Sequence, residues 1–144
     1  MGVLTTMSAY MKEIEKPAGV GLDIPAMLGF PDVGRATPTL PVACLFFQDD
    51  DYAGPQQAHR LGQVQPVGRQ VTGSLVVIAN TEQELLRLVD TLRDVKVSLS
   101  AVTAGGEVWT VRYSPTRRTT VELPERQLQY AVETLLTFTT RKEN

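Results

Sequence analysis

Three consecutive carboxylates are the residues of this chain best suited to chemistry. Asp49, Asp50 and Asp51 stand in the stretch QDDDYAG, directly after the apolar run LPVACLFF at residues 40–47. A cluster of this kind can hold a divalent cation, act in general acid–base chemistry, or lie in a solvated loop. The apolar run is typical of a buried strand, so we expect the acids in a long polar loop over residues 48–66, where that strand ends.

The spacing of the three acids does not favour a metal site. In an extended chain neighbouring side chains point to opposite faces. At most Asp49 and Asp51 could therefore share a face and bind the same cation. The DxDxDG pattern of a calcium loop is absent, and no glutamate follows at the distance that such a loop requires. The sequence therefore predicts no metal and no other cofactor, and it favours an acidic loop that is solvated or lies in an interface.

The single histidine and the single cysteine form no catalytic pattern either. His59 stands in AHRLG without a neighbouring carboxylate or cysteine that would orient it as a general base, so a surface position is expected. Cys44 lies within the apolar run, where an isolated thiol is typically a small core residue, and one cysteine cannot form an intramolecular disulfide or a cysteine-rich zinc site. We therefore expect a protein that is not an enzyme. One alternative is kept: a small cytosolic ligand-binding domain or enzyme with a pocket near Asp49, Asp51 and His59.

A basic pair, Arg117-Arg118, follows a Ser-Pro-Thr turn between two predicted strands. The strands and the turn together are typical of a protruding β-hairpin over residues 108–123, with the two arginines at its tip. By itself such a pair lies in a solvated turn. In an assembly it could instead contact the acidic loop at residues 49–51 of a neighbouring subunit.

Length and composition are those of one globular domain. At 144 residues the chain can bury a core of its own, and we treat residues 1–144 as a single domain. Apolar residues make up 42% and charged residues 21%, which argues against overall disorder. The net charge of -2 gives no reason to expect a membrane partner or sequence-specific binding to nucleic acid. No apolar run of about 18 residues and no secretory leader pattern is present, so we expect the chain to stay in the cytosol.

Hydrophobic periodicity predicts an α+β order of elements. Thr81 and Glu84 form a capping box, and apolar residues at helical spacing follow it, so a helix is predicted over residues 81–94. Residues 95–102 fit both a helix and a strand and stay open. The other predicted elements are a helix over 5–15, a glycine- and proline-rich arm over 17–41, strands over 40–47 and 69–79, the hairpin over 108–123, and a long alternating strand over 128–138. The simplest packing is a mostly antiparallel sheet with a helix packed on one face, a long N-terminal arm and the protruding hairpin.

The order of elements and several local stretches resemble one family, the tail terminator proteins of long-tailed bacteriophages. The stretches are a strand led by a proline (PTLPVAC, 38–44), a polar acidic loop (QDDDYAG, 48–54), a β-branched strand that runs directly into a capped helix (LVVIANTEQELL, 75–86), and the closing alternating strand (128–138). The resemblance covers most of a core at residues 38–140, which the N-terminal helix and arm at residues 1–37 precede. The arm is longer and richer in glycine, and the hairpin better developed, than the family pattern.

The resemblance implies a structural virion protein without bond chemistry. Such a chain forms a ring, typically a hexamer, that caps the finished tail tube, ends tail polymerisation and presents a surface to the neck of the head. The implied partners are other copies of the chain, the tail tube protein, a neck, head-completion or connector protein and, where a tail has one, the sheath. The implied place is the virion tail, assembled in the cytoplasm of the bacterial host. A head–tail connector, neck or baseplate subunit is the nearest alternative.

In such a ring the contacts would come from the acidic loop, the arginines and the apolar arm, which could lie on a neighbouring subunit. Heterologous contacts close a ring when the rotation between subunits allows it, and complementary charges can set that rotation. Exposed ion pairs contribute only about 0–1 kcal/mol each, so apolar burial by the arm must carry most of the affinity. The candidate interface residues are Asp49, Asp50, Asp51, Tyr52, Arg69, Arg117, Arg118, Leu22, Ile24 and Phe30.

Overall fold

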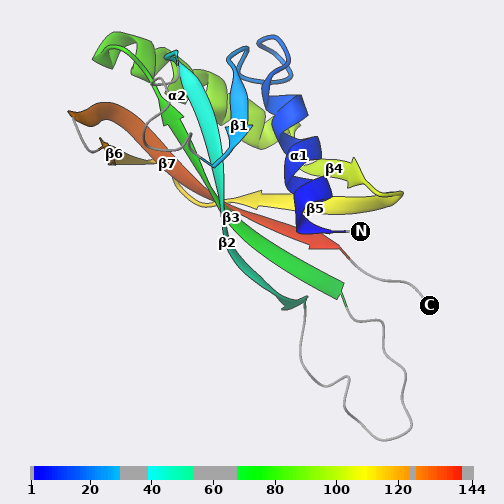
Figure 1. Ribbon diagram of the computed structural model, residues 1–144. Coiled ribbons are helices and arrows are strands. Elements are labelled where there is room, and N and C mark those ends of the chain that lie inside the picture. The colour runs from blue at the N-terminus through cyan, green and yellow to red at the C-terminus, as the bar shows by residue number, and fades with distance from the viewer. Residues whose placement is uncertain (1, 30–38, 54–67, 124–125, 141–144) are drawn as a thin grey trace, which may run out of the picture.

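In the computed structural model the described residues are 2–29, 39–53, 68–123 and 126–140, and they form one seven-stranded sheet with two helices (Figure 1). The elements are α1 (Val3–Ile14), β1 (Ala26–Leu28), β2 (Val42–Ala53), β3 (Gly68–Ile78), α2 (Glu82–Ser98), β4 (Ala101–Ala104), β5 (Glu107–Tyr113), β6 (Arg117–Leu123) and β7 (Arg126–Thr140). The prediction of a sheet-dominated α+β fold is confirmed. The strands lie in the order β1-β2-β3-β7-β5-β4, with β6 also paired to β7, and β1 with β2 is the one parallel pair among these.

The long strand β7 organises the sheet and overturns the predicted hairpin. It pairs along one edge with β3, and along the other edge with β5 and then β6. The strands β5 and β6 therefore do not pair with each other, and the hairpin predicted over residues 108–123 is wrong. The physical reason lies in the link between them, because the Ser114 N–H donates to the Leu135 carbonyl (2.9 Å) and the Leu135 N–H donates to Ser114 Oγ (2.8 Å). Lys96 of α2 also donates to the Ser114 carbonyl (2.9 Å), so the link runs beside β7 and the chain does not reverse there.

Helix α2 begins at the capping box that the sequence predicts. The Glu84 N–H donates to Thr81 Oγ1 (3.1 Å), and Glu84 Oε1 accepts from the Asn80 N–H (2.8 Å). Its buried stripe is Leu85, Leu88, Leu92 and Val95. Residues 95–102, which the sequence left open, divide between two elements: the helix continues through Ser98, and β4 begins at Ala101.

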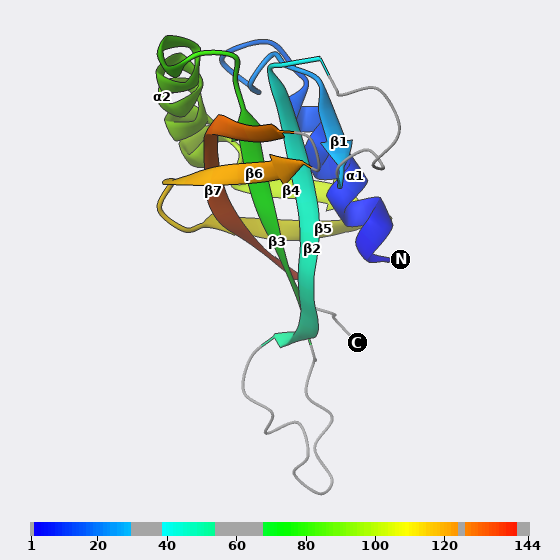
Figure 2. The ribbon, with the colours of Figure 1, turned by 60° about the vertical axis from the view of Figure 1, so that its left-hand side comes forward.

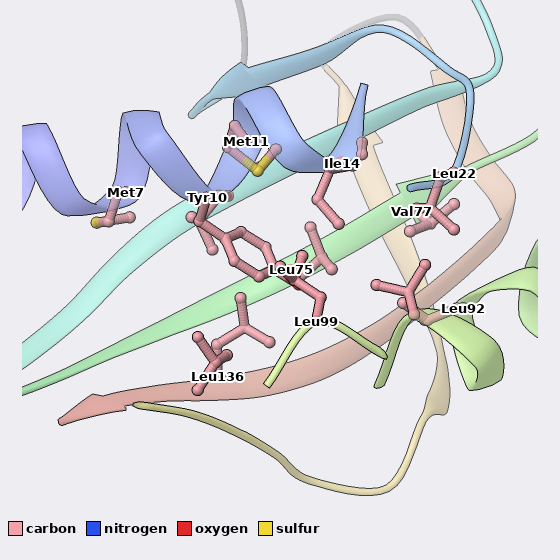
Figure 3. Close-up of a cluster of buried hydrophobic side chains, with 14 of the residues drawn as sticks. Met7, Tyr10, Met11, Ile14, Leu22, Leu75, Val77, Leu92, Leu99 and Leu136 are labelled. Carbon is pink, nitrogen blue, oxygen red and sulfur yellow. The ribbon is translucent and has the colours of Figure 1, made fainter. Parts of the chain in front are cut away.

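The main core lies between the helices and the sheet (Figure 3). It joins Met7, Tyr10, Met11 and Ile14 of α1 and the buried stripe of α2 to side chains of β2, β3, β5 and β7. The Tyr10 hydroxyl donates to the Tyr113 hydroxyl (3.2 Å), which donates to the Leu99 carbonyl (2.6 Å). Burial raises the pKa of Tyr10 and raises the pKa of Tyr113 to about 12, so both phenols act as neutral hydrogen-bonding groups that tie α1 to β5 and to the end of α2.

A second, smaller core lies on the opposite face of the sheet. Its buried members are Val42, Cys44, Val76, Ile78, Leu128 and Ala131, with Phe46 and Val121 partly buried against them. Alternate residues of β2 and β3 therefore enter different cores, as the continuous apolar runs of these strands predict. Val121 of β6 packs against this second core, and Figure 2 shows β6 in the upper half of the molecule.

The described part of the arm packs on its own chain. Leu22 and Ile24 are 3% and 8% exposed and belong to the main core, and the Leu22 N–H donates to the Ile14 carbonyl at the end of α1 (2.8 Å). Gly21 allows this close approach, because a Cβ there would lie 2.6 Å from the Ile14 carbonyl oxygen. The predicted set of interface residues includes Leu22 and Ile24, but their side chains are already buried within the chain and offer little surface to a neighbour. Phe30, in the same set, lies outside the described residues.

Candidate interface surfaces

The three acids lie in a strand and not in a loop. β2 continues through Ala53, and Asp49, Asp50 and Asp51 pair with Thr72, Val71 and Gln70 of β3. The predicted loop is therefore wrong for residues 48–53, while residues 54–66, with His59, lie outside the described residues. The reason is that β3 offers partners along its whole length, and these pairings outweigh the polar composition of the segment. A β-bulge between Phe47 and Asp49 marks the change from apolar to acidic strand.

The acids divide between the two faces of the sheet. Asp50 lies opposite Val71, a residue of the main core, and its carboxylate is bound by Arg69, which precedes Val71 by two residues in β3. The two bonds are Arg69 Nε to Asp50 Oδ1 (2.9 Å) and Nη2 to Oδ2 (2.7 Å), a bidentate pair. The hydrogen bonds from Arg69 lower the pKa of Asp50. Both side chains stay more than a third exposed, so the pair contributes less than about 1 kcal/mol to folding.

Asp49 and Asp51 point to the other face, as the alternation of the strand requires. Asp49 Oδ1 accepts from the Asp50 N–H (2.8 Å). Tyr52 pairs through its backbone with Arg69. Within the described residues no group of three His, Cys, Asp or Glu side chains converges on a point where a metal ion could bind. The described part of the acidic stretch is thus the charged end of a strand.

The two arginines stand at the start of β6, away from the acids. Arg118 donates to the carboxylate of Glu82, in the first turn of α2. Arg117 is exposed and lies opposite Glu133 of β7, whose carboxylate accepts from Ser74 Oγ (2.7 Å). Figure 2 shows β6 across the upper half of the molecule and the end of β2 at its lower tip, so one chain does not bring the two charged groups together.

Cys44 is an inert core residue. Its side chain is fully buried, and burial raises the pKa of the thiol to about 12. A thiol with that pKa stays protonated near neutral pH and reacts slowly with electrophiles. The prediction that Cys44 is a core residue is confirmed.

A groove between α1 and β4 was not predicted from the sequence. It has a volume of about 770 Å³, and its lining includes Leu4, Ser8 and Lys12 of α1 and Ala101 and Thr103 of β4. Leu4 is 69% exposed on the α1 side of this groove. The lining holds no histidine or cysteine, and it mixes apolar side chains with five polar or charged ones: Thr5, Ser8, Lys12, Glu13 and Thr103. The groove lies between segments that are almost a hundred positions apart in the chain, so no local sequence pattern predicts it.

The comparisons with known proteins give no relative for the chain. A scan against models of protein families finds no match, and a search of curated proteins finds no similar sequence. In the described part of the chain, neither helix is long and apolar enough to cross a membrane.

Proposed function

We propose that the chain is a structural subunit of a long-tailed bacteriophage, a tail terminator that forms a ring, typically of six copies, on the end of the finished tail tube. The observation that carries the proposal is the order of elements over residues 38–140. A β-branched strand runs directly into a capped helix, here β3 and α2, and a long alternating strand, here β7, closes the fold. This is the order through which the chain resembles the tail terminator family.

The surface chemistry supports a binding role. Exposed charges stand at two separate places on the described surface, Asp49 and Asp51 at the end of β2 and Arg117 at the start of β6, beside the ion pairs Asp50–Arg69 and Glu82–Arg118. Between neighbouring copies such separated charges favour head-to-tail contacts and disfavour contacts between like surfaces. In this role the ring binds the tail tube protein on one side and a neck, head-completion or connector protein on the other, with the sheath as a further partner in a contractile tail.

The test is the length of tails assembled without the protein. In phage particles that lack the chain, tail tubes should continue past their normal length, and electron micrographs should show a broad length distribution. Supplying the wild-type chain in trans should restore one length. Tails of normal, uniform length in its absence would overturn the assignment as a terminator.

A further inference from the structure

The groove between α1 and β4 runs along an edge of β4 that has no strand partner among the described residues. Among the described residues β4 pairs only with β5, at one end of the sheet. The Ser100 carbonyl accepts from the Val111 N–H of β5 (2.8 Å), so the backbone of Ser100 faces β5. Alternate residues of a strand turn their backbone groups to opposite sides, and the N–H and C=O groups of Ala101 and Thr103 therefore face away from β5, where both residues line the groove. Unpaired groups along such an edge bind an extended chain.

The opposite end of the sheet is complementary to this edge. β1 pairs only with β2 among the described residues. The Pro25 carbonyl accepts from the Ala43 N–H (2.9 Å) and the Gly29 N–H donates to the Leu45 carbonyl (2.8 Å), so the backbone groups of Pro25 and Gly29 face β2. By the same alternation, the backbone groups of Ala26 and Leu28 face outward. Each edge thus offers two residues whose N–H and C=O groups have no strand partner among the described residues. β1 runs parallel to β2, and the antiparallel pairs β2–β3, β3–β7, β7–β5 and β5–β4 bring β4 back to the direction of β1.

The exposed apolar side chains at the two edges also match. Ala26 packs against the main core, so Leu28, two residues on, points to the same side of the sheet as the helices. Leu28 is 39% exposed, and Leu4 stands 69% exposed on the α1 wall of the groove. In a sheet continued from one chain to the next with its helices on one side, Leu28 of one copy would meet Leu4 of the other.

We infer that a second copy of this chain fills the groove, its β1 adding in parallel to β4 and its Leu28 packing on Leu4. The inference rests on the proposed ring and identifies one of the contacts that build it. A second copy fits better than an unrelated peptide, because a single repeated contact covers both open edges of every subunit, whereas a peptide would leave β1 exposed. The two surfaces differ, so the contact is heterologous and forms rings or filaments, not isolated pairs.

Crosslinking between two single variants tests the contact. Leu4→Cys and Leu28→Cys each add one exposed thiol, and the fully buried Cys44 does not compete for the reagent. Treated with a short bismaleimide, a mixture of the two variants should give a crosslinked dimer that contains one copy of each, and the double variant should give a ladder of larger species. The matched control is Val97→Cys, which is 80% exposed on α2, mixed with Leu28→Cys. A yield no higher than in this control would overturn the inference, as would efficient crosslinking of Leu4→Cys to itself.

A second variant tests the backbone pairing without adding a thiol. Ala101→Pro removes an outward N–H at the first residue of an edge strand, a position where proline is tolerated. It should raise the concentration needed for assembly by roughly two- to tenfold, whereas Ala101→Ser should leave that concentration unchanged.

The failure of this inference is distinguishable from failure of the proposed function. An oligomer that forms without the Leu4–Leu28 crosslink contradicts only the β1–β4 contact, and normal tail lengths in the absence of the protein contradict only the terminator role.

Discussion

Replacing Leu4 with alanine should weaken self-association without destabilising the fold. A fully buried leucine side chain contributes about 1.5–3 kcal/mol. Leu4 is 69% exposed in the isolated chain, so about two-thirds of that contribution, roughly 1–2 kcal/mol per contact, is still to be gained when a neighbour covers it. The dissociation constant of each contact should therefore rise about 5- to 30-fold. Alanine is a strong helix former, so α1 itself should stay intact.

The assay is sedimentation velocity over a dilution series, with urea unfolding of each variant to check the fold. Val97→Ala is the matched control, because Val97 is 80% exposed on α2 and lies outside both sheet edges. It should assemble like the wild type. The reasoning is refuted if Leu4→Ala assembles at the same concentrations as the wild type, or if Val97→Ala weakens assembly as much.

Two further predictions concern the frame that holds these surfaces. Gly21→Ala would place a Cβ 2.6 Å from the Ile14 carbonyl oxygen. Because the backbone must shift to relieve this contact, the change should lower the free energy of unfolding by about 2 kcal/mol or more. A urea unfolding curve that matches the wild type would contradict this prediction. The lowered pKa of Asp50 stabilises the fold above the unfolded pKa of about 4, and this contribution is lost as the pH falls through the lower folded value. Asp50→Asn should therefore cost less than about 1 kcal/mol at pH 7 and almost nothing at pH 2, and a cost that grows toward low pH would contradict the assignment.

The elements that could be predicted from the sequence are those with strong local signals. The capping box at Thr81 and the apolar stripe after it specify α2 from residues adjacent in the chain. The alternation over residues 128–138 likewise predicts β7, because successive side chains of a strand point to opposite faces and one face of β7, with Val132, Leu136 and Phe138, packs in the main core. Cys44 could be placed in the core from another local signal, the continuous apolar run in which it lies.

The errors all concern the choice of partner. The acids at residues 49–51 belong to β2 because β3 pairs with them, and composition alone does not report that pairing. The residues of β5 and β6 have strand patterns, and the turn between them predicts that they pair with each other. Both strands pair with β7 instead. Leu22 and Ile24 are apolar enough to bind a neighbour, yet the end of α1 lies close enough to bury them in their own chain. The groove at β4 has the same origin, because it forms between segments that only the tertiary fold brings together.

These errors also change how the arm can be tested. Deleting residues 17–34 would remove Leu22 and Ile24 from the main core and β1 from the sheet, so it would destabilise the isolated subunit itself and would not report on the proposed ring alone. Point changes on exposed residues separate the two effects. Arg117→Ala, for example, alters an exposed charge whose loss should change assembly only slightly.

The mass of the purified chain in solution tests the central claim most directly. Light scattering across a concentration series should give a species several times the 15.8 kDa of one chain, with a limiting mass that matches a closed ring. A mass of 15.8 kDa at the highest concentration reached, together with a thermal stability that rises when a metal ion or a metabolite is added, would contradict self-association and favour a ligand-binding domain.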